Sequence, residues 1–431
     1  MFSQGYRDRA LAECEVVGIA SRIELKSDAS AGRVHSTRTI GQRLTLHSRL
    51  SRYKRTLEIQ LGDHNAAFLW GPRKVGKTTL LHQQFPAARF YDLLNTEVKM
   101  QLLLHPSRLR EEVLATKDPL VVVDEVQKVP VLLDEVHWCL ENTSTKFILC
   151  GSSARKLRRG AANLLGGRAW RYELFPLTTQ ELGDYDLERI VNHGLIPQHY
   201  REHIPERSLR GYVLDYLEQE INAEAVTRNV PAFAKFLEAV TLTHGQLLNY
   251  ATVARDCGVS AKTVREYYQI LEDTLLGHTL PPWRKSKKRR LIETAKFYLF
   301  DPGIVRALSG MRLIQRGSEE FGRAFEHFLI EEVRAYLSYS EKYLPMTFWR
   351  TSTGMEVDLL VGDGDLAIEC KAAAQVDERH TQGLRALLED QRVKQAVIVS
   401  LDMTLRQLPG GITVYPWQLF CQKLWAGDFA L

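Results

Sequence analysis

The chain has 431 residues, of which 45% are hydrophobic and 25% are charged, an ordinary globular mixture. At roughly 100–200 residues per domain, this length corresponds to about two to four domains. No apolar run approaches the ~20 residues that a membrane helix needs, and the N-terminus has no secretory apolar region, so we expect a soluble cytoplasmic protein without a membrane partner. The net charge of +5 is only mildly basic, so the position of the charges matters more than their sum.

The first half of the chain predicts an α/β domain. Residues 1–45 are polar and aperiodic and indicate a flexible extension. Leu50, Tyr53, Leu57 and Leu61 then recur at helical spacing, which predicts a helix ending near Gly62. Short apolar strands are expected over residues 66–70, 119–124, 146–151 and 170–174, and helical stretches separate them. This alternation predicts a parallel sheet covered by helices, which we assign to residues 46–185.

The sequence of the second half predicts a helical stretch followed by two further regions. Residues 186–240 are mostly helical and are expected to form a lid or linker. Residues 241–310 show helix, turn, helix, strand, loop and strand, the order of a winged helix. Residues 315–431 begin with a helix and continue with strand-like runs, which predicts a separate α/β domain.

A phosphate-binding loop follows the first strand. The run GPRKVGKT matches GxxxxGK(S/T) between a predicted strand and a predicted helix, the context that this motif requires. Its backbone N–H groups are expected to surround phosphate oxygens, with Lys77 on the β- and γ-phosphates and Thr78 on Mg²⁺. The residues expected to bind ATP are Gly71, Pro72, Arg73, Val75, Gly76, Lys77, Thr78 and Thr79.

Two acids end the second apolar strand, VVVDE. Asp124 is expected to hold Mg²⁺ together with Thr78, and Glu125 to orient the attacking water. The alternative is a pair of solvated carboxylates at a strand end. Coupling to the upstream phosphate-binding loop favours the catalytic interpretation, so ATP and Mg²⁺ are the expected substrate and cofactor.

Two later positions have a catalytic and a structural interpretation. Ser152 ends a third strand and is either a sensor of the γ-phosphate or part of a helix start, where Ser153 fits as the N-cap. Arg168 follows two glycines at a helix end. It is either an arginine finger for a neighbouring subunit or a surface arginine that the helix dipole favours.

These segments together resemble a known family. The runs GPRKVGKTTLL, VVVDEVQKVP, FILCGSSARKL and LLGGRAWRYELFPLTTQEL resemble the bacterial and archaeal AAA+-type ATPases that carry a C-terminal nuclease-like domain. The resemblance covers about residues 46–431. It implies Lys77, Thr78, Asp124 and Glu125 in their usual roles, with Ser152 as sensor and Arg168 as finger. It also implies a homo-oligomer, in the form of a ring, because the finger acts in trans.

A basic run lies in the loop of the predicted winged helix. Lys262 and Arg265 are expected to face outward on its second helix together with Tyr268, while Val264 and Leu271 form its core. Six cations follow in the loop, and such a run gives salt-sensitive binding to nucleic acid without reading sequence. The alternatives are a solvated loop or docking of a protein. The residues expected to contact DNA are Lys262, Arg265, Arg284, Lys285, Lys287, Lys288, Arg289 and Arg290.

The C-terminal region carries a partial nuclease motif. Asp358, then about ten residues, then Glu369 and Lys371 resembles the PD-(D/E)xK core, in which two carboxylates bind Mg²⁺ and the lysine activates water. The resemblance adds Glu326 as a ligand on a helix. The chain has Glu-Val-Asp in place of Pro-Asp, and nuclease-like folds also serve as DNA-binding or scaffolding modules.

The expected fold class is therefore α/β, with a P-loop AAA+-type parallel sheet, a helical and winged-helix middle region, and a restriction-endonuclease-like C-terminal domain. Three functions remain open at this stage. The first is an oligomeric DNA-binding motor that remodels or translocates DNA, with branched or recombination DNA as a target. The second is an ATP-gated DNA nuclease in genome defence, and the third is an ATP-controlled switch that docks a protein partner.

Overall fold

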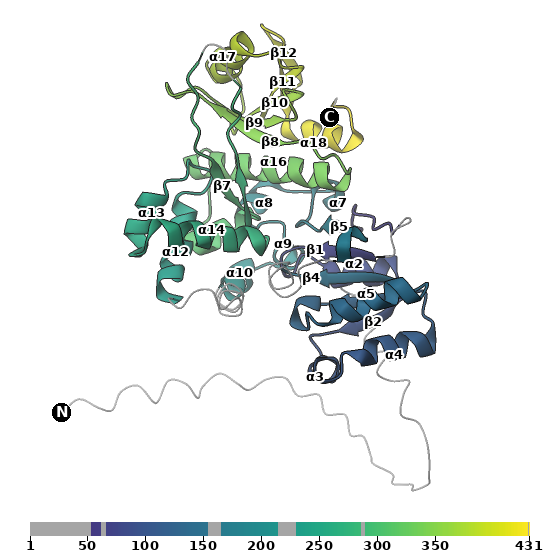
Figure 1. Cartoon of the computed structure of the whole chain (residues 1–431). Helices are drawn as coiled ribbons and strands as arrows, with labels where there is room; N and C mark the ends of the chain where they lie inside the picture. Colours follow the sequence, from purple (N-terminus) through teal and green to yellow (C-terminus); the bar gives the residue numbers. More distant parts are fainter. Residues whose placement is uncertain (1–52, 62–65, 154–164, 214–229, 286–288, 430) are drawn as a thin grey trace, which may run out of the picture. The chain divides into compact units, whose positions relative to one another are not determined.

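A computed structural model describes residues 53–61, 66–153, 165–213, 230–285, 289–429 and 431, all of which fall in one structural unit, Ser51–Leu431 (Figure 1). The extension expected over residues 1–45 lies outside the described residues, as do Lys287 and Lys288. None of the described helices combines the length and apolar character needed to cross a bilayer. Five described cysteines are buried free thiols: Cys139, Cys150, Cys257, Cys370 and Cys421.

A parallel five-stranded sheet organises the first region, in the order β2-β3-β4-β1-β5. Its strands are β1 (Ala66–Trp70), β2 (Arg89–Asp92), β3 (Leu120–Asp124), β4 (Lys146–Gly151) and β5 (Ala169–Glu173). The helices between them are α2 (Lys77–Gln84), α3 (Thr96–Leu104), α4 (Ser107–Thr116) and α5 (Leu132–Asn142).

Both faces of this sheet are covered, which explains its continuous apolar strands. Successive side chains of a strand point to opposite faces. Phe68 and Val123 accordingly pack with α4 and α5, whereas Leu69 and Val122 pack with α2. The order places β4 between β1 and β3, so that the phosphate-binding loop after β1 and the acids after β3 lie at one edge of the sheet.

The helix expected before β1 is wrong over its described part. Residues 53–61 contain no helix. Leu57 and Ile59 are buried beside α2. The buried side chains of this segment are therefore two residues apart, which is the period of an extended chain. The Oε1 of Gln84 accepts a hydrogen bond from the backbone N–H of Ile59 at 3.1 Å, which fixes this segment along the sheet domain.

The middle region is mostly helical and ends in an antiparallel pair of strands. Its elements are α7 (Thr179–Leu182), α8 (Leu187–His193), α9 (Pro197–Arg201), α10 (Pro205–Gly211), α12 (Val230–Leu242), α13 (Tyr250–Cys257), α14 (Ala261–Asp273), β6 (Gly277–Leu280), β7 (Lys296–Leu299) and α15 (Pro302–Ser309).

The side chain of Tyr268, expected to face outward on α14, is instead only 4% exposed. Its ring lies edge-on to Phe236 and Phe297, with centroids 4.9 and 4.8 Å away. Positions 264, 267, 268 and 271 form one helical face, so an aromatic residue at position 268 belongs to the core. Lys262 and Arg265 are exposed on the other side of α14.

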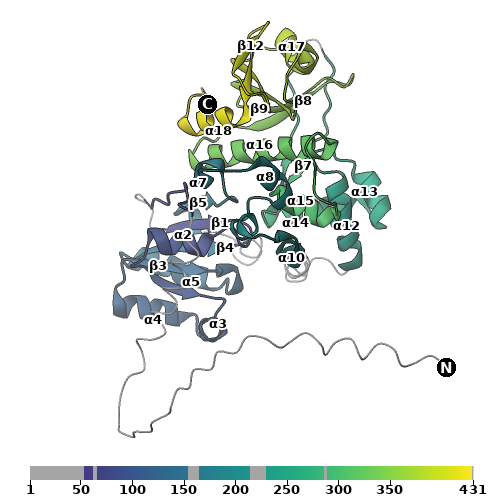
Figure 2. The same ribbon diagram turned by 180° about the vertical axis from the view of Figure 1, so that it is seen from behind.

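The C-terminal domain contains a mixed six-stranded sheet, in the order β12-β13-β11-β10-β9-β8. Its elements are α16 (Glu319–Tyr339), β8 (Met346–Arg350), β9 (Glu356–Val361), β10 (Leu366–Lys371), α17 (Gln382–Asp390), β11 (Gln395–Ser400), β12 (Arg406–Leu408), β13 (Ile412–Pro416) and α18 (Trp417–Ala426). Helices α16 and α18 pack on one face of this sheet and α17 packs on the other, as the two views show (Figures 1 and 2).

The basic loop between β6 and β7 is not a free wing. Its flanks run along β8, the edge strand of the C-terminal sheet. The backbone N–H of Trp283 donates to the carbonyl of Phe348 at 2.7 Å, and that of Ile292 donates to Arg350 at 2.9 Å. The side chain of Trp283 is only 7% exposed, in the core beside α17. These contacts use backbone groups that an edge strand otherwise leaves unpaired.

Candidate nucleotide-binding site

The loop between β1 and α2 has the backbone geometry of a phosphate cradle. Gly76 has a φ of 99°, which a residue with a side chain rarely adopts. A Cβ on Gly71 would meet the carbonyl oxygen of Leu174 at 2.5 Å, so only glycine fits there. The loop therefore leads directly into the N-terminus of α2, where free N–H groups and the helix dipole attract anions.

The side chain of Lys77 lies inside this loop. Its ammonium donates to the carbonyls of Gly71 and Pro72 at 2.7 and 2.9 Å, and the residue is 6% exposed. The loop thus holds the ammonium beside the N–H groups that would receive phosphate.

Oxygen ligands for a magnesium ion meet at the end of β3. The hydroxyl of Thr78 donates to Oδ2 of Asp124 at 2.5 Å. Mg²⁺ takes oxygen ligands and is usually bound through one or two protein groups plus water and substrate phosphates. This donor set fits that pattern, with Thr78 and Asp124 as the protein ligands.

Glu125 and Ser152, both predicted from the sequence, are joined by hydrogen bonds through Gln127, which was not predicted. Its backbone is left-handed, with a φ of 58°, and it is 8% exposed. The Nε2 of Gln127 donates to Oε2 of Glu125 at 2.5 Å and lies 3.1 Å from Oγ of Ser152. The sequence motif marks the two acids and not Gln127, which lies two residues after Glu125 and is buried.

Ser152 directly follows β4 and is 1% exposed. Through Gln127 it is connected to Glu125 at the same edge of the sheet as the phosphate-binding loop. Its role as sensor stays a prediction. The residues after Ser153, where a helix was expected to start, lie outside the described residues.

Arg168 lies at the far end of the sheet from its own phosphate-binding loop. The register pairs Ala66 with Ala169 and Trp70 with Glu173, so β5 begins where β1 begins. The guanidinium of Arg168 forms an ion pair with Glu141 at 2.7 Å, and its side chain is 50% exposed. The loop follows the opposite end of β1, so Arg168 does not face the phosphate-binding loop of its own chain, and its role as an arginine finger stays a prediction.

A second residue missed by sequence analysis, Arg55, connects the loop to the rest of the chain. Its guanidinium donates to the carbonyl of Val75 at 2.5 Å and to that of Phe175 at 2.7 Å. It also pairs with Glu181 at 3.0 Å and reaches the hydroxyl of Tyr339 on α16 at 3.3 Å. No local sequence motif indicates the role of Arg55, because its partners are distant in the sequence.

Residues 63–183 match a family model described as an AAA domain. The chain contains an AAA-type P-loop ATPase domain. Residues 184–314 match a model described as Domain of unknown function (DUF8612), and residues 321–420 match Domain of unknown function (DUF4143). The AAA model therefore covers the sheet, the phosphate-binding loop and the acids of β3.

Two curated relatives were found, the uncharacterized proteins Rv2008c of Mycobacterium tuberculosis and Mb2031c of Mycobacterium bovis. Each is 28% identical over 305 residues, which are 68% of this chain and 66% of the relative. The chain thus matches just under two thirds of the length of these relatives.

Among solved structures, the Walker-type ATPase PABY2304 of Pyrococcus abyssi is 14% identical and covers 64% of this chain and 96% of its own, with a TM-score of 0.38. The Orc1 protein of Aeropyrum pernix in complex with DNA is 12% identical and covers 65% of this chain and 94% of its own, with a TM-score of 0.26. At these TM-scores, neither structure assigns a partner or a substrate to this chain.

The C-terminal domain brings Asp358, Glu369 and Lys371 of the nuclease motif together, while Glu326 on α16 pairs with Lys296. Asp358 on β9 accepts a hydrogen bond from the backbone N–H of Cys370 at 2.8 Å, and Lys371 forms an ion pair with Glu369. The ammonium of Lys371 lies 4.0 Å from Asp358. Burial and mutual repulsion raise the pKa of Glu369 well above its usual range, and burial together with Glu326 on α16 raises that of Asp358.

The described cations of the basic loop differ in their surroundings. Arg284 and Arg290 are exposed. Lys285 forms an exposed ion pair with Asp363 at 2.5 Å, and Arg289 forms one with Glu389 at 2.6 Å. The loop is therefore partly neutralised by the domain on which it lies.

Proposed function

We propose that this ATPase acts on DNA as an oligomer and couples ATP hydrolysis to moving or remodelling the DNA. The observation that carries the proposal is the attachment of the basic loop along β8. The hydrogen bonds of Trp283 and Ile292 hold the loop at both flanks. The exposed side chains of Arg284 and Arg290 are thereby presented from a fixed backbone, which suits repeated contact with phosphates.

In this proposal, the residues of the nucleotide site bind ATP and Mg²⁺ and position the attacking water. Lys77 and the N–H groups of the loop bind the phosphates, and Thr78 and Asp124 hold the metal. The Mg²⁺ ion, when bound, neutralises charge that develops on the transferred phosphate. Glu125 orients water for attack, and Gln127 fixes the Glu125 carboxylate while contacting Ser152.

The proposal includes an oligomer because of where Arg168 lies in the sheet domain. An arginine that stabilises transition-state charge in trans accelerates phosphoryl transfer by about 10³–10⁵-fold. Arg168 lies at the opposite end of β5 from the loop of its own subunit. The exposed ion pair with Glu141 is weak enough to be exchanged for a phosphate contact.

Charge reversal tests the DNA contact. Arg284→Glu combined with Arg290→Glu should weaken DNA binding and flatten its dependence on salt, because fewer counterions are released. Lys235→Glu, an exposed lysine on α12, is the matched control and should change binding little. If the double variant binds DNA as the unaltered chain does, the loop is not the contact, and docking of a protein partner becomes the better proposal.

A second candidate, an ATP-gated nuclease, is favoured by the convergence of Asp358, Glu369 and Lys371. The Oε2 of Glu369 is buried and has no hydrogen-bond partner, so one carboxylate oxygen is available to a metal. Incubation of branched, duplex and single-stranded DNA with Mg²⁺ or Mn²⁺ tests this candidate. Cleavage that disappears in Asp358→Ala supports it, and intact DNA under every condition rejects it.

A further inference from the structure

A lysine of the middle region lies among the acids of the C-terminal domain. Lys296 begins β7, yet its ammonium lies 2.6 Å from Oε1 of Glu356 and 3.4 Å from Oε1 of Glu326. Its side chain is 4% exposed, and the ammonium faces the ring of Phe348, whose centroid is 5.3 Å away. A charge this deeply buried is retained only where it is paired.

Lys296 is a permanent cation at this place. Burial opposes its charge, but the carboxylates of Glu326, Asp358 and Glu356 outweigh burial and raise the pKa of Lys296 above its ordinary value. The same strand supplies Tyr298, whose hydroxyl donates to Oε1 of Glu326 at 2.6 Å. Two side chains of β7 therefore engage one glutamate of α16.

This arrangement determines which acids are left for a metal. Glu326 is engaged by β7, and the second oxygen of Glu356 accepts from Arg350 at 2.9 Å. The Asp358–Glu369 pair, with Lys371 beside both carboxylates, is then the candidate for a metal. Within the described parts of the chain, no three acids, histidines or cysteines come close enough together to hold a metal ion.

We propose that Lys296 is an internal counter-cation that keeps a divalent metal ion from binding tightly to the carboxylates of the C-terminal domain. The Asp358–Glu369 pair fits a metal because both carboxylates are buried and Oε2 of Glu369 lacks a partner. Lys296 opposes the metal by adding positive charge and by forming an ion pair with Glu326. The strand that carries Lys296 belongs to the middle region, so a shift of β7 would release Glu326 and strengthen metal binding.

The inference rests on the second candidate function only for the choice of the carboxylate pair. It concerns metal affinity, which is measured without DNA and without catalysis. A chain that binds Mn²⁺ in the way expected but cuts no DNA would reject the nuclease and leave the role of Lys296 standing.

The test is Mn²⁺ binding by the full-length, nucleotide-free chain, followed by electron paramagnetic resonance. Lys296→Met should bind Mn²⁺ on the order of tenfold or more tightly than the unaltered chain, because a positive charge near the ion is removed. Lys296→Arg keeps the charge and should remain weak. Lys296→Met combined with Asp358→Asn should lose the gain, which separates this site from Thr78 and Asp124 in the AAA domain.

Folding is controlled separately, because Lys296 is buried. Lys296→Gln retains an amide that can donate to Glu326 and Glu356, and it replaces Lys296→Met if the latter unfolds before the metal titration. Lys285→Met, at an exposed lysine that pairs with Asp363, is the surface control. Equal Mn²⁺ affinity in the unaltered chain and in a folded variant without the charge, Lys296→Met or Lys296→Gln, would overturn the proposal, as would a gain that survives Asp358→Asn.

Discussion

The amide of Gln127 lies 2.5 Å from the carboxylate of Glu125 and 3.1 Å from the hydroxyl of Ser152. One buried side chain thus joins the residue expected to orient water and the residue expected to sense the γ-phosphate. A static hydrogen bond of this kind fixes the position of a carboxylate without adding charge to the site.

Replacing Gln127 with leucine should therefore reduce turnover more than nucleotide binding. We expect kcat to fall by about 10–100-fold with little change in KM, because a small displacement of a water-orienting group is costly. Steady-state ATP hydrolysis checks this expectation. Gln127→Glu is the companion variant, since it puts a second carboxylate beside Glu125 and should be at least as damaging. A parallel rise of KM in Gln127→Leu would instead place the residue in nucleotide binding.

Mixing two inactive variants tests whether Arg168 acts in trans. Lys77→Ala removes phosphate binding, and Arg168→Ala removes the finger while leaving its own loop intact. In a mixed oligomer, an intact loop meets an intact Arg168 from its neighbour, so ATPase activity should reappear on mixing. Arg171→Ala, at an exposed arginine on β5, is the control and should be active alone. Two variants that remain inactive after subunit exchange would contradict action in trans.

The anchor of the basic loop can be removed without changing its charge. Trp283→Ala should lower the free energy of unfolding of the C-terminal domain by about 3–5 kcal/mol, since a buried tryptophan leaves a cavity. It should also weaken DNA binding, because the exposed arginines are no longer held along β8. Binding is measured at a temperature where circular dichroism shows the variant to be folded. Unchanged affinity would mean that charge alone, and not its fixed placement, governs the contact.

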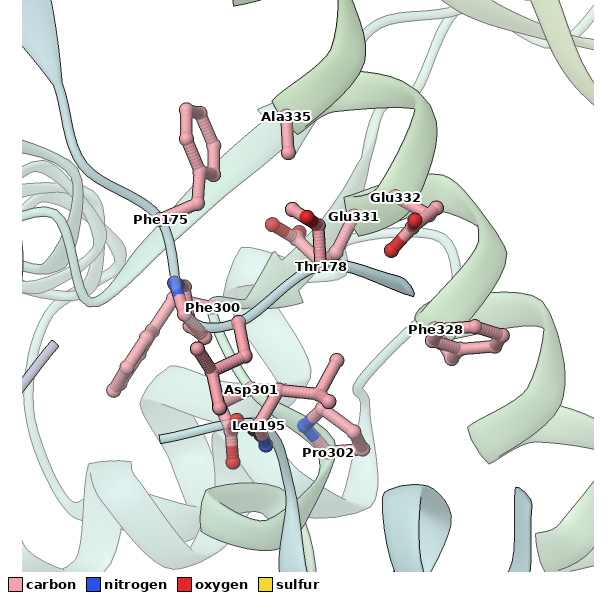
Figure 3. Close-up of a pocket in the computed structure, with 12 residues that line it drawn as sticks. Phe175, Thr178, Leu195, Phe300, Asp301, Pro302, Phe328, Glu331, Glu332 and Ala335 are labelled. Atoms are coloured by element: carbon pink, nitrogen blue, oxygen red, sulfur yellow. Dashed lines mark hydrogen bonds between the residues drawn. The ribbon is translucent and has the colours of Figure 1, made fainter. Parts of the chain in front are cut away.

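Buried acids of α16 should make the stability of the protein depend on pH. Glu331 and Glu332 line a cavity of about 20 Å³ beside Thr178 (Figure 3). Burial raises the pKa of each of these carboxyls to about 7. A raised folded-state pKa means that the folded chain binds more protons, so stability is present at low pH and is lost as pH rises from the unfolded value near 4.5 toward 7.

Glu332→Gln should remove part of this dependence. Its carboxylate accepts hydrogen bonds from the backbone of Thr179 and from the indole of Trp425, and an amide oxygen can accept the same bonds. We expect the variant to match the unaltered chain at pH 5 and to melt at a higher temperature at pH 8. Glu320→Gln, on the exposed side of α16, should leave the pH profile as it is. The same slope in Glu332→Gln as in the unaltered chain would assign the dependence to other groups.

The sequence predicted the parts of the fold whose causes are local. The strands at residues 66–70 and 146–151 appear where expected, because buried strands are continuous apolar runs bounded by turns. The phosphate-binding loop was predicted together with its strand and helix, since glycine and lysine spacing follows directly from the needs of phosphate binding. Strand β2 was missed because its four residues, Arg89–Asp92, carry almost no apolar pattern.

The remainder depends on contacts between distant residues. Gln127, Arg55 and Lys296 act through partners that no spacing rule connects to them. The helix predicted before β1 failed because four-residue spacing was given more weight than the alternation that buries Leu57 and Ile59. The attachment of Trp283 to β8 likewise depends on an edge strand that begins more than sixty residues later in the chain.

The most direct test of the central claim is the rate of ATP hydrolysis with four-way-junction, duplex or single-stranded DNA, each at low and high salt. We predict that one DNA structure stimulates hydrolysis strongly, that salt abolishes the stimulation, and that Glu125→Gln is inactive throughout. Reduced stimulation in the Arg284→Glu and Arg290→Glu double variant, with unchanged basal hydrolysis, would locate the contact. A rate that is indifferent to every DNA would contradict the account of this protein as a DNA-dependent ATPase.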